Sequence, residues 1–317
     1  MKNGMAAVLS IILGCSVAID AQWPKYPAGG AQRDAQGNVL QAGPAPKTAD
    51  GKPDLSGVWM RADSGPPRAG GPGRGQGAGG GRGNAAVPGN GAFFGGPGGV
   101  LVEIPTERFP HDPNGPAVAT FREAGANIPG GLPFTPWASE LKKQRMALDQ
   151  KDNPDANCLP MGFLQFHLQP QPRKIIQTPQ LVLIEYESNY GIRHIYTDGR
   201  TLPPPGSVQP WWYGYSVGRW DGNDLVVETN NLRGAEESEF DGWLDVNGSP
   251  YSSQARITER FRRPAYGHLQ IDMTVEDVKS YTKPWTVRVD QRLLPDQELI
   301  EFVCNENQQF RRRIKID

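Results

Sequence analysis

The C-terminal half of the chain is a succession of short segments that are apolar or alternate between apolar and polar residues. The segments are Lys174–Pro179, Leu181–Asn189, Gly191–Asp198, Tyr213–Trp220, Leu225–Leu232, Gln254–Arg263, Leu269–Asp277, Trp285–Leu294 and Leu299–Asn305. Tight turns such as Asp221–Asp224, Pro264–Gly267 and Pro295–Glu298 join several of them, and no helical pattern intervenes. A sheet this long normally closes on itself or folds over, because both arrangements remove exposed strand edges. We therefore predict an all-β protein, an antiparallel up-and-down barrel of about eight or nine strands, with a β-sandwich as the alternative.

Glycine and proline mark the parts of the chain that we expect to be irregular. The sequence has 39 glycines and 30 prolines, which together are 69 of 317 residues, or about 22%. Average proteins contain roughly 12% of these two residues combined. Glycine is concentrated in residues 65–99, a composition that buries too little apolar area to offset chain entropy and therefore predicts a disordered loop. The remaining divisions are an irregular arm at 22–53, a first strand at 54–64, an irregular segment at 100–173 and the β-meander at 174–317.

One helix is expected, over residues 136–149. Thr135 is a suitable N-cap and Pro136 suits the first helical position. Trp137, Leu141 and Leu148 fall on one apolar stripe, so we expect this helix to dock on the sheet.

Residues 1–21 have the features of an export signal. Lys2 provides the positive charge, Met5–Leu13 is a short apolar run, and a small-residue cleavage site follows at Ala18 or Ala21. This pattern predicts a periplasmic or secreted protein of a Gram-negative bacterium. The apolar run is too short to span a bilayer as a helix, and no other segment is expected to cross a membrane.

The three cysteines are consistent with export and add two expectations, an alternative lipid anchor and a disulfide. Cys15 lies in a sequence that also resembles a lipoprotein cleavage box, so a lipid anchor at Cys15 is an alternative to simple cleavage. Removal of the signal leaves Cys158 and Cys304, which we expect to form a disulfide in an oxidising compartment. Two cysteines without a CxxC spacing cannot form a zinc or iron–sulfur site by themselves.

Charge and motifs exclude several function classes. The 33 basic residues balance 34 acidic ones, which argues against a nucleic-acid partner. The sequence lacks a nucleophile elbow, a dinucleotide-binding loop and a Walker A loop, and the four histidines have no metal-binding spacing. We therefore expect no cofactor and no metal.

Two resemblances supplement these patterns. Gly57-x-Trp59 resembles the first motif of the lipocalin and wider calycin barrels, where the Trp packs across the barrel floor and an Arg from the last strands stacks on it. That resemblance implies a calycin-like barrel with Arg311, Arg312 or Arg313 in this role.

The second resemblance spans nearly the whole mature chain and involves a family of exported bacterial proteins of unassigned function. The similar segments are Asp50–Gly57, Val217–Gly222, Thr258–Pro264, Tyr281–Val287 and Phe302–Asn307. This resemblance implies export but no activity.

Strand alternation suggests a candidate site inside the barrel. Successive side chains of a strand point to opposite faces. His194 shares a strand face with Ile192, Arg219 shares one with Val217, and Glu259 shares one with Ile257. If these faces point inward, the three polar side chains are buried and must pair. Such a group can be purely structural. Alternatively, His194 acts as general acid or base, Glu259 orients it and Arg219 holds an anionic or carbonyl oxygen.

An aromatic group near the strand ends adds candidate ligand-binding residues. They are Trp212, Tyr213, Tyr215 and Tyr196, with Asp198 and Arg200 at the rim. Our leading hypothesis is an exported barrel that binds a small, partly apolar or aromatic molecule in its interior. A cofactor-free lyase, isomerase or hydrolase using His194 and Glu259 is the first alternative, and a surface interaction protein is the second.

Overall fold

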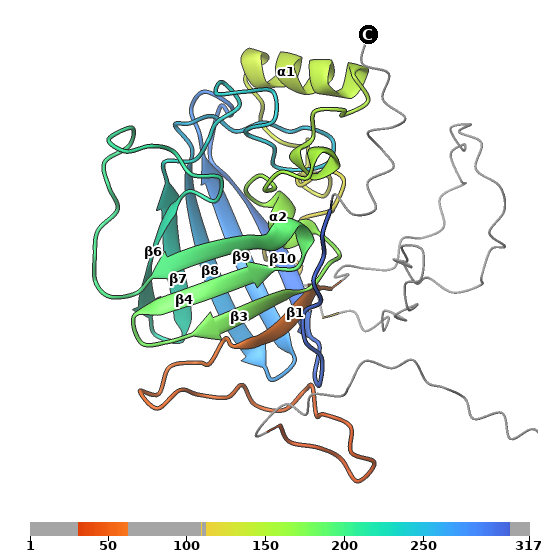
Figure 1. Ribbon diagram of the computed structural model, residues 1–317, viewed down its shortest axis with the longest axis vertical. Helices are drawn as coiled ribbons and strands as arrows, with labels where there is room; N and C mark the ends of the chain where they lie inside the picture. The colour runs from red at the N-terminus through yellow and green to blue at the C-terminus, as the bar shows by residue number, and fades with distance from the viewer. Residues whose placement is uncertain (1–30, 63–108, 110–111, 305–317) are drawn as a thin grey trace, which may run out of the picture.

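The computed structural model describes residues 31–62, 109 and 112–304 of the chain (Figure 1). The strands are β1 (Gly57–Arg61), β2 (Ala117–Val118), β3 (Arg173–Gln177), β4 (Leu181–Tyr186), β5 (Gly191–Tyr196), β6 (Tyr215–Asp221), β7 (Asp224–Asn230), β8 (Arg256–Ala265), β9 (His268–Glu276) and β10 (Trp285–Leu293). The helices are α1 (Pro136–Ala147) and α2 (Gln165–Leu168), with 3-10 turns η1 (Pro154–Asn157) and η2 (Ser188–Tyr190). The expected signal segment, Cys15, the Gly-rich segment and Arg311–Arg313 lie outside the described residues.

The strands form a closed barrel, as the sequence predicts. Strand order is β1-β3-β4-β5-β6-β7-β8-β9-β10, and the pairing of β1 with β10 closes the ring. Strand β2 adds in parallel to β10 through Val287↔Ala117 and Arg288↔Val118. Figure 1 shows β3 and β4 as one wall, in front of a second wall made by β6 to β10.

The barrel differs from a simple meander in two places. Strands β5 and β6 are parallel, because the long connection 197–214 returns the chain to the end at which β5 begins. Residues 299–304, within the expected last strand, are irregular. The ninth strand is β1 instead, which comes from far upstream and lies between β3 and β10.

Strand β1 carries the Gly-x-Trp motif into the core. The Trp59 indole is fully buried, and its Nε1 donates to the Leu55 carbonyl at 3.0 Å. The guanidinium of Arg263, on β8, lies 4.8 Å from the Trp59 ring centroid. An arginine therefore stacks on this Trp, although it comes from β8. Gly57 has a φ of +143°, and a Cβ there would lie 2.6 Å from a Leu293 methyl group, so this position requires glycine.

The chain fills the barrel with one of its own segments. Residues 161–170, which include α2, are buried throughout. Phe166 packs edge-on against Phe163 and also contacts Tyr186 of β4, with ring centroids 4.9 Å apart in both pairs. These side chains belong to the same core cluster as the inward residues of the strands. The part of the lumen in which we expected a ligand is thus occupied by the segment around α2.

Helix α1 lies beyond one end of the barrel (Figure 1) and begins as predicted. Thr135 Oγ1 accepts from the Ala138 amide at 3.3 Å. The prediction that Leu148 belongs to the docking surface of this helix is wrong, because Leu148 is 51% exposed. Arg145 faces inward instead: it donates to the carbonyls of Asp241 and Gly242 at 2.7 and 2.9 Å. The helix therefore docks on the loop that follows β7 rather than on the sheet.

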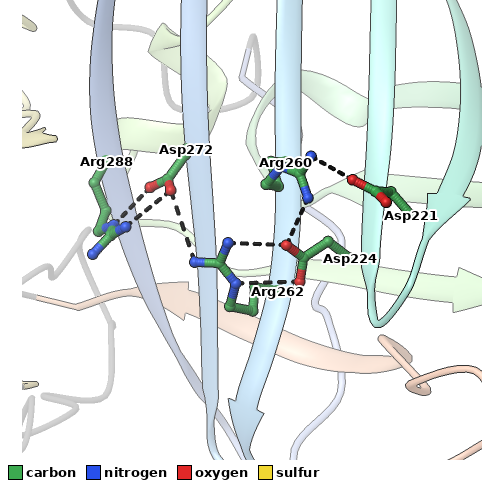
Figure 2. Close-up of polar contacts among 6 residues, drawn as sticks. All are labelled: Asp221, Asp224, Arg260, Arg262, Asp272 and Arg288. Atoms are coloured by element: carbon green, nitrogen blue, oxygen red, sulfur yellow. Dashed lines mark hydrogen bonds and ion pairs between the residues drawn. The ribbon is translucent and has the colours of Figure 1, made fainter. Parts of the chain in front are cut away.

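The outer surface of β6 to β10 carries a row of alternating charges, shown in Figure 2. Its members are Asp221, Asp224, Arg260, Arg262, Asp272 and Arg288. Asp224 bridges Arg260 at 2.8 Å and Arg262 at 2.9 Å, and Asp272 binds Arg288 at 2.6 Å. The charges cancel across the row, so this part of the wall is polar and has no net charge of its own.

Candidate functional site

The face of β5 that points into the barrel is the opposite of the expected one. Ile195 is fully buried and Arg193 is 1% exposed, whereas Ile192 is 50% exposed and His194 points to solvent. The prediction that His194 lies inside the barrel is therefore wrong. The inward face accepts a charged residue because the barrel supplies Arg193 with a buried partner.

That partner is Glu259, the one member of the expected interior group that does lie inside. Its carboxylate accepts from Arg193 Nη1 at 3.0 Å and pairs closely with Nη2. Arg193 also donates to Ser216 Oγ and Thr229 Oγ1, each at 3.1 Å. Ser216 and Thr229 belong to β6 and β7, so the polar row runs along the inner wall from β5 to β8.

His167 completes this buried cluster from the segment that fills the lumen. Its Nε2 lies 2.9 Å from Glu259 Oε1, and both side chains are buried. Because an ionised carboxylate only accepts hydrogen bonds, the neutral imidazole must carry its proton on Nε2. Nδ1 is then an acceptor, with no hydrogen-bond partner among the described residues.

The cluster is electrically neutral as a whole. Burial by itself would raise the pKa of Glu259, but the charge of Arg193 and the hydrogen bonds from His167 and Arg193 outweigh burial and lower that pKa to about 2. Burial lowers the pKa of His167 to about 4 despite the nearby carboxylate. One guanidinium therefore balances one carboxylate beside a neutral imidazole, an arrangement suited to holding the inner wall and the α2 segment together.

The expected catalytic group is not assembled. His194 lies outside the barrel wall and Glu259 lies inside it. Arg219 is also on the outer face, with its side chain 65% exposed, and it pairs with Glu228 at 3.1 Å. The prediction that Arg219 points inward is wrong, because Ser216 and Gly218 form the buried face of β6.

Sequence patterns do not identify Arg193 and His167, which pair with Glu259, or the hydroxyl partners Ser216 and Thr229. Arg193 lies on the face of its strand opposite to the one expected to point inward. His167 lies in a segment without strand or helix periodicity, where the one available signal was a histidine inside the apolar run 161–168.

All four of the expected ligand-binding aromatic residues, Tyr196, Trp212, Tyr213 and Tyr215, lie together, but outside the lumen. They line a hollow of about 240 Å³ in the wall between β5 and the start of β6. The lining residues are Pro160, Ile192, Arg193, His194, Tyr196, Trp211, Trp212, Tyr213, Gly214, Tyr215 and Ser216. The hollow forms where the wall is least continuous, since β5 and β6 pair only through Ile195↔Ser216 and Tyr196↔Val217.

The rim of the hollow is held by the turn after β5. Arg200 is paired with Asp198 at 2.6 Å and donates to Tyr215 Oη at 3.0 Å. Its guanidinium also lies 3.8 Å from the ring centroid of Tyr196, which stacks on Tyr215 at 5.3 Å. Asp198 and Arg200 thus lie beside two of the lining aromatic residues, Tyr196 and Tyr215, on the outside of the wall.

Tyr213 closes the inner side of the hollow. Its ring contacts Phe166 and Tyr186 in the interior at 5.4 and 5.8 Å. Gly191 makes room for it, because a Cβ there would lie 2.1 Å from Tyr213 Oη. Trp212, also in the lining, is covered by the guanidinium of Arg233 at 4.4 Å.

The predicted disulfide is present. Cys158 and Cys304 are bonded and close a loop with a sequence separation of 146 residues. The bond ties the irregular segment after β10 to the turn after η1, which lies close to Pro160 of the hollow.

The class of protein that these observations define is a closed β-barrel with a filled lumen and an aromatic hollow in its wall. No family model, no curated protein and no solved structure matches this chain significantly. Within the described part of the chain, no helix combines the length and apolar character needed to cross a membrane. The same residues contain no group of three or more His, Cys, Asp or Glu side chains placed to hold a metal ion.

Proposed function

We propose that this protein is an exported β-barrel that binds a small, partly apolar or aromatic molecule in the hollow between β5 and β6. The observation that carries the proposal is the gathering of aromatic side chains around an open hollow, with Trp211 41% exposed beside the exposed Ile192. Exposed apolar side chains clustered around a concavity are typical of binding sites.

The hollow replaces the barrel interior as the proposed site. Residues 161–170 occupy the lumen, and the buried cluster around Glu259 has its charges paired. The acid–base alternative is weakened by the wall that separates His194 from Glu259. The surface-interaction alternative would use the same exposed aromatics, so the size of the bound partner distinguishes the two.

Export is supported by the features of residues 1–21 and by the Cys158–Cys304 bond, since disulfides persist in oxidising compartments. The test is fractionation of a Gram-negative host followed by N-terminal sequencing of the mature protein. A periplasmic or secreted chain beginning after Ala18 or Ala21 supports export, whereas a cytoplasmic chain that retains Met1 contradicts it.

Native mass spectrometry of protein purified from its host tests the binding function. We expect a small-molecule adduct on the wild-type chain that is lost in Trp211→Ala. Trp220→Ala is the matched control: Trp220 lies on the same strand wall but outside the hollow, and that variant should keep the adduct. Absence of any adduct, together with unchanged tryptophan fluorescence across a metabolite extract, would contradict the proposal, and capture of a macromolecule alone would favour the surface-interaction alternative.

A further inference from the structure

The hollow exposes one side of an aromatic ring to solvent and does not enclose a ligand between two rings. Tyr196 is packed against Tyr215, His194 and Arg200, so its ring is largely engaged within the protein. Trp211 meets Tyr215 at a tilt of 52° and is 41% exposed. Typical pockets bury 70–90% or more of the surface of a drug-sized ligand. A flat aromatic ligand therefore fits best where both faces of its ring are covered, which this open hollow does not provide. The open Trp211 side suits a ligand with one apolar face and polar edges.

The rim supplies polar groups that are already fixed in place. Asp198 and Arg200 form a fork with several hydrogen bonds between them, and Tyr215 Oη holds the other side of the guanidinium. The fork presents an acceptor and a donor side by side, which matches hydroxyl groups because each hydroxyl both donates and accepts. Its charges cancel, as do those of Arg193 and Glu259 behind it, so among the described residues around the hollow no arginine or carboxylate is left unpaired to select an ionic ligand.

From these features, and resting on the proposed function, we infer that the hollow binds one ring of an uncharged saccharide. The apolar C–H face of the sugar packs on Trp211, and its hydroxyls meet the Asp198–Arg200 fork. The volume of about 240 Å³ lies below the roughly 300–1,000 Å³ of typical small-molecule pockets, which favours a single ring. Because the rim is exposed, further sugar units can extend from that ring into solvent.

Isothermal titration calorimetry of the full mature chain tests this inference. The probes are three neutral hexasaccharides (cellohexaose, mannohexaose and maltohexaose) and one planar aromatic compound, 1-naphthol. We expect at least one hexasaccharide to bind, and Trp211→Ala to lower its affinity about tenfold, the effect of losing one stacking surface.

The rim variant separates a sugar from an aromatic ligand. Asp198→Asn loosens the fork, so we expect hexasaccharide affinity to fall about tenfold while any 1-naphthol binding changes less than twofold. Trp220→Ala and Arg219→Lys are the controls for the two substitutions, since both residues lie on β6 outside the lining, and neither should change sugar affinity. Melting temperatures of all four variants check that the barrel is intact.

The outcomes distinguish failure of the saccharide inference from failure of the proposed binding function. Binding of 1-naphthol without any hexasaccharide overturns the saccharide inference and leaves the proposed function in place. Failure of all four probes overturns the saccharide inference, and the host-purified adduct then decides the proposed function separately. Sugar binding that is unaffected by both Trp211→Ala and Asp198→Asn shows that the sugar lies elsewhere and also overturns the inference.

Discussion

Arg193 and His194 are consecutive residues of β5, yet their side chains lie on opposite sides of the barrel wall. Arg193 reaches along the inner wall to Glu259, whereas His194 stands outside at the edge of the aromatic hollow. Side-chain alternation along the strand places Arg193 in the buried cluster and His194 on the exposed side of the hollow, and Arg193 also contributes to the lining of the hollow. The two sites are therefore tested through residues that only one of them contains, Glu259 for the cluster and Trp211 for the hollow.

The buried ion pair should matter strongly for stability. Glu259→Gln leaves the Arg193 guanidinium buried without a counter-charge, so we expect the free energy of unfolding to fall by about 3–5 kcal/mol. Urea denaturation followed by far-UV circular dichroism measures the change. Glu228→Gln is the matched control, because Glu228 pairs with the exposed Arg219 and Arg256, and its loss should cost less than about 1 kcal/mol. Equal effects of the two variants would contradict the assignment of Glu259 as a structural anchor.

Stability should decrease as the pH falls below about 6.5. The pKa of His167 is lowered from 6.5 to about 4 in the folded state, so between these values the unfolded chain takes up a proton that the folded chain does not. Glu259 acts in the same direction at lower pH: its pKa is lowered from 4.5 to about 2, so its stabilising contribution is present above pH 4.5 and is lost as the pH falls toward 2.

Urea unfolding at intervals from pH 7 to pH 4 measures this dependence. His167→Gln keeps a side-chain donor toward Glu259 but cannot titrate, so we expect a flatter profile between pH 6.5 and pH 4. His194→Gln, outside the wall and apart from the cluster, is the control and should retain the wild-type slope. A slope that persists in His167→Gln would show that other groups dominate acid unfolding.

The disulfide should stabilise the fold by constraining the unfolded chain. The double variant Cys158→Ser/Cys304→Ser removes a cross-link across 146 residues of sequence, and we expect a loss of about 2–5 kcal/mol. Thermal melts of the oxidised protein, the reduced protein and the double variant provide the measurement. The last two should coincide, and a reduced protein as stable as the oxidised one would contradict the prediction.

Small substitutions at Gly191 and Tyr213 should have opposite effects on the stability of the protein. A Cβ at position 191 would collide with Tyr213 Oη, so Gly191→Ala should destabilise the protein by about 1–3 kcal/mol and disturb the inner side of the hollow. Tyr213→Phe removes a buried hydroxyl that has no hydrogen-bond partner among the described residues, so stability should stay the same or rise slightly. Denaturation midpoints of the two variants test the pair. If Tyr213→Phe lost more than about 1 kcal/mol, its hydroxyl would have to serve a partner such as bound water.

Local chemistry accounts for what the sequence by itself determined. Alternating residues and tight turns specify β-strands, Thr135 and Pro136 specify a helix start, and two remaining cysteines specify a disulfide, because each signal depends on neighbouring residues or on counting alone. The closed barrel followed from the need to remove sheet edges.

Tertiary structure alone decided which face of each strand points inward. In β5 both faces carry apolar residues, so alternation allows Ile192 with His194 or Arg193 with Ile195 to be buried. The choice depends on partners distant in sequence: Glu259 neutralises Arg193, and the α2 segment brings His167 and fills the lumen. The same long-range packing sets β5 parallel to β6 and so opens the aromatic hollow on the outside of the wall. No local sequence pattern predicts these contacts, because they join residues distant in sequence and stabilise the protein only when the closed barrel brings those residues together.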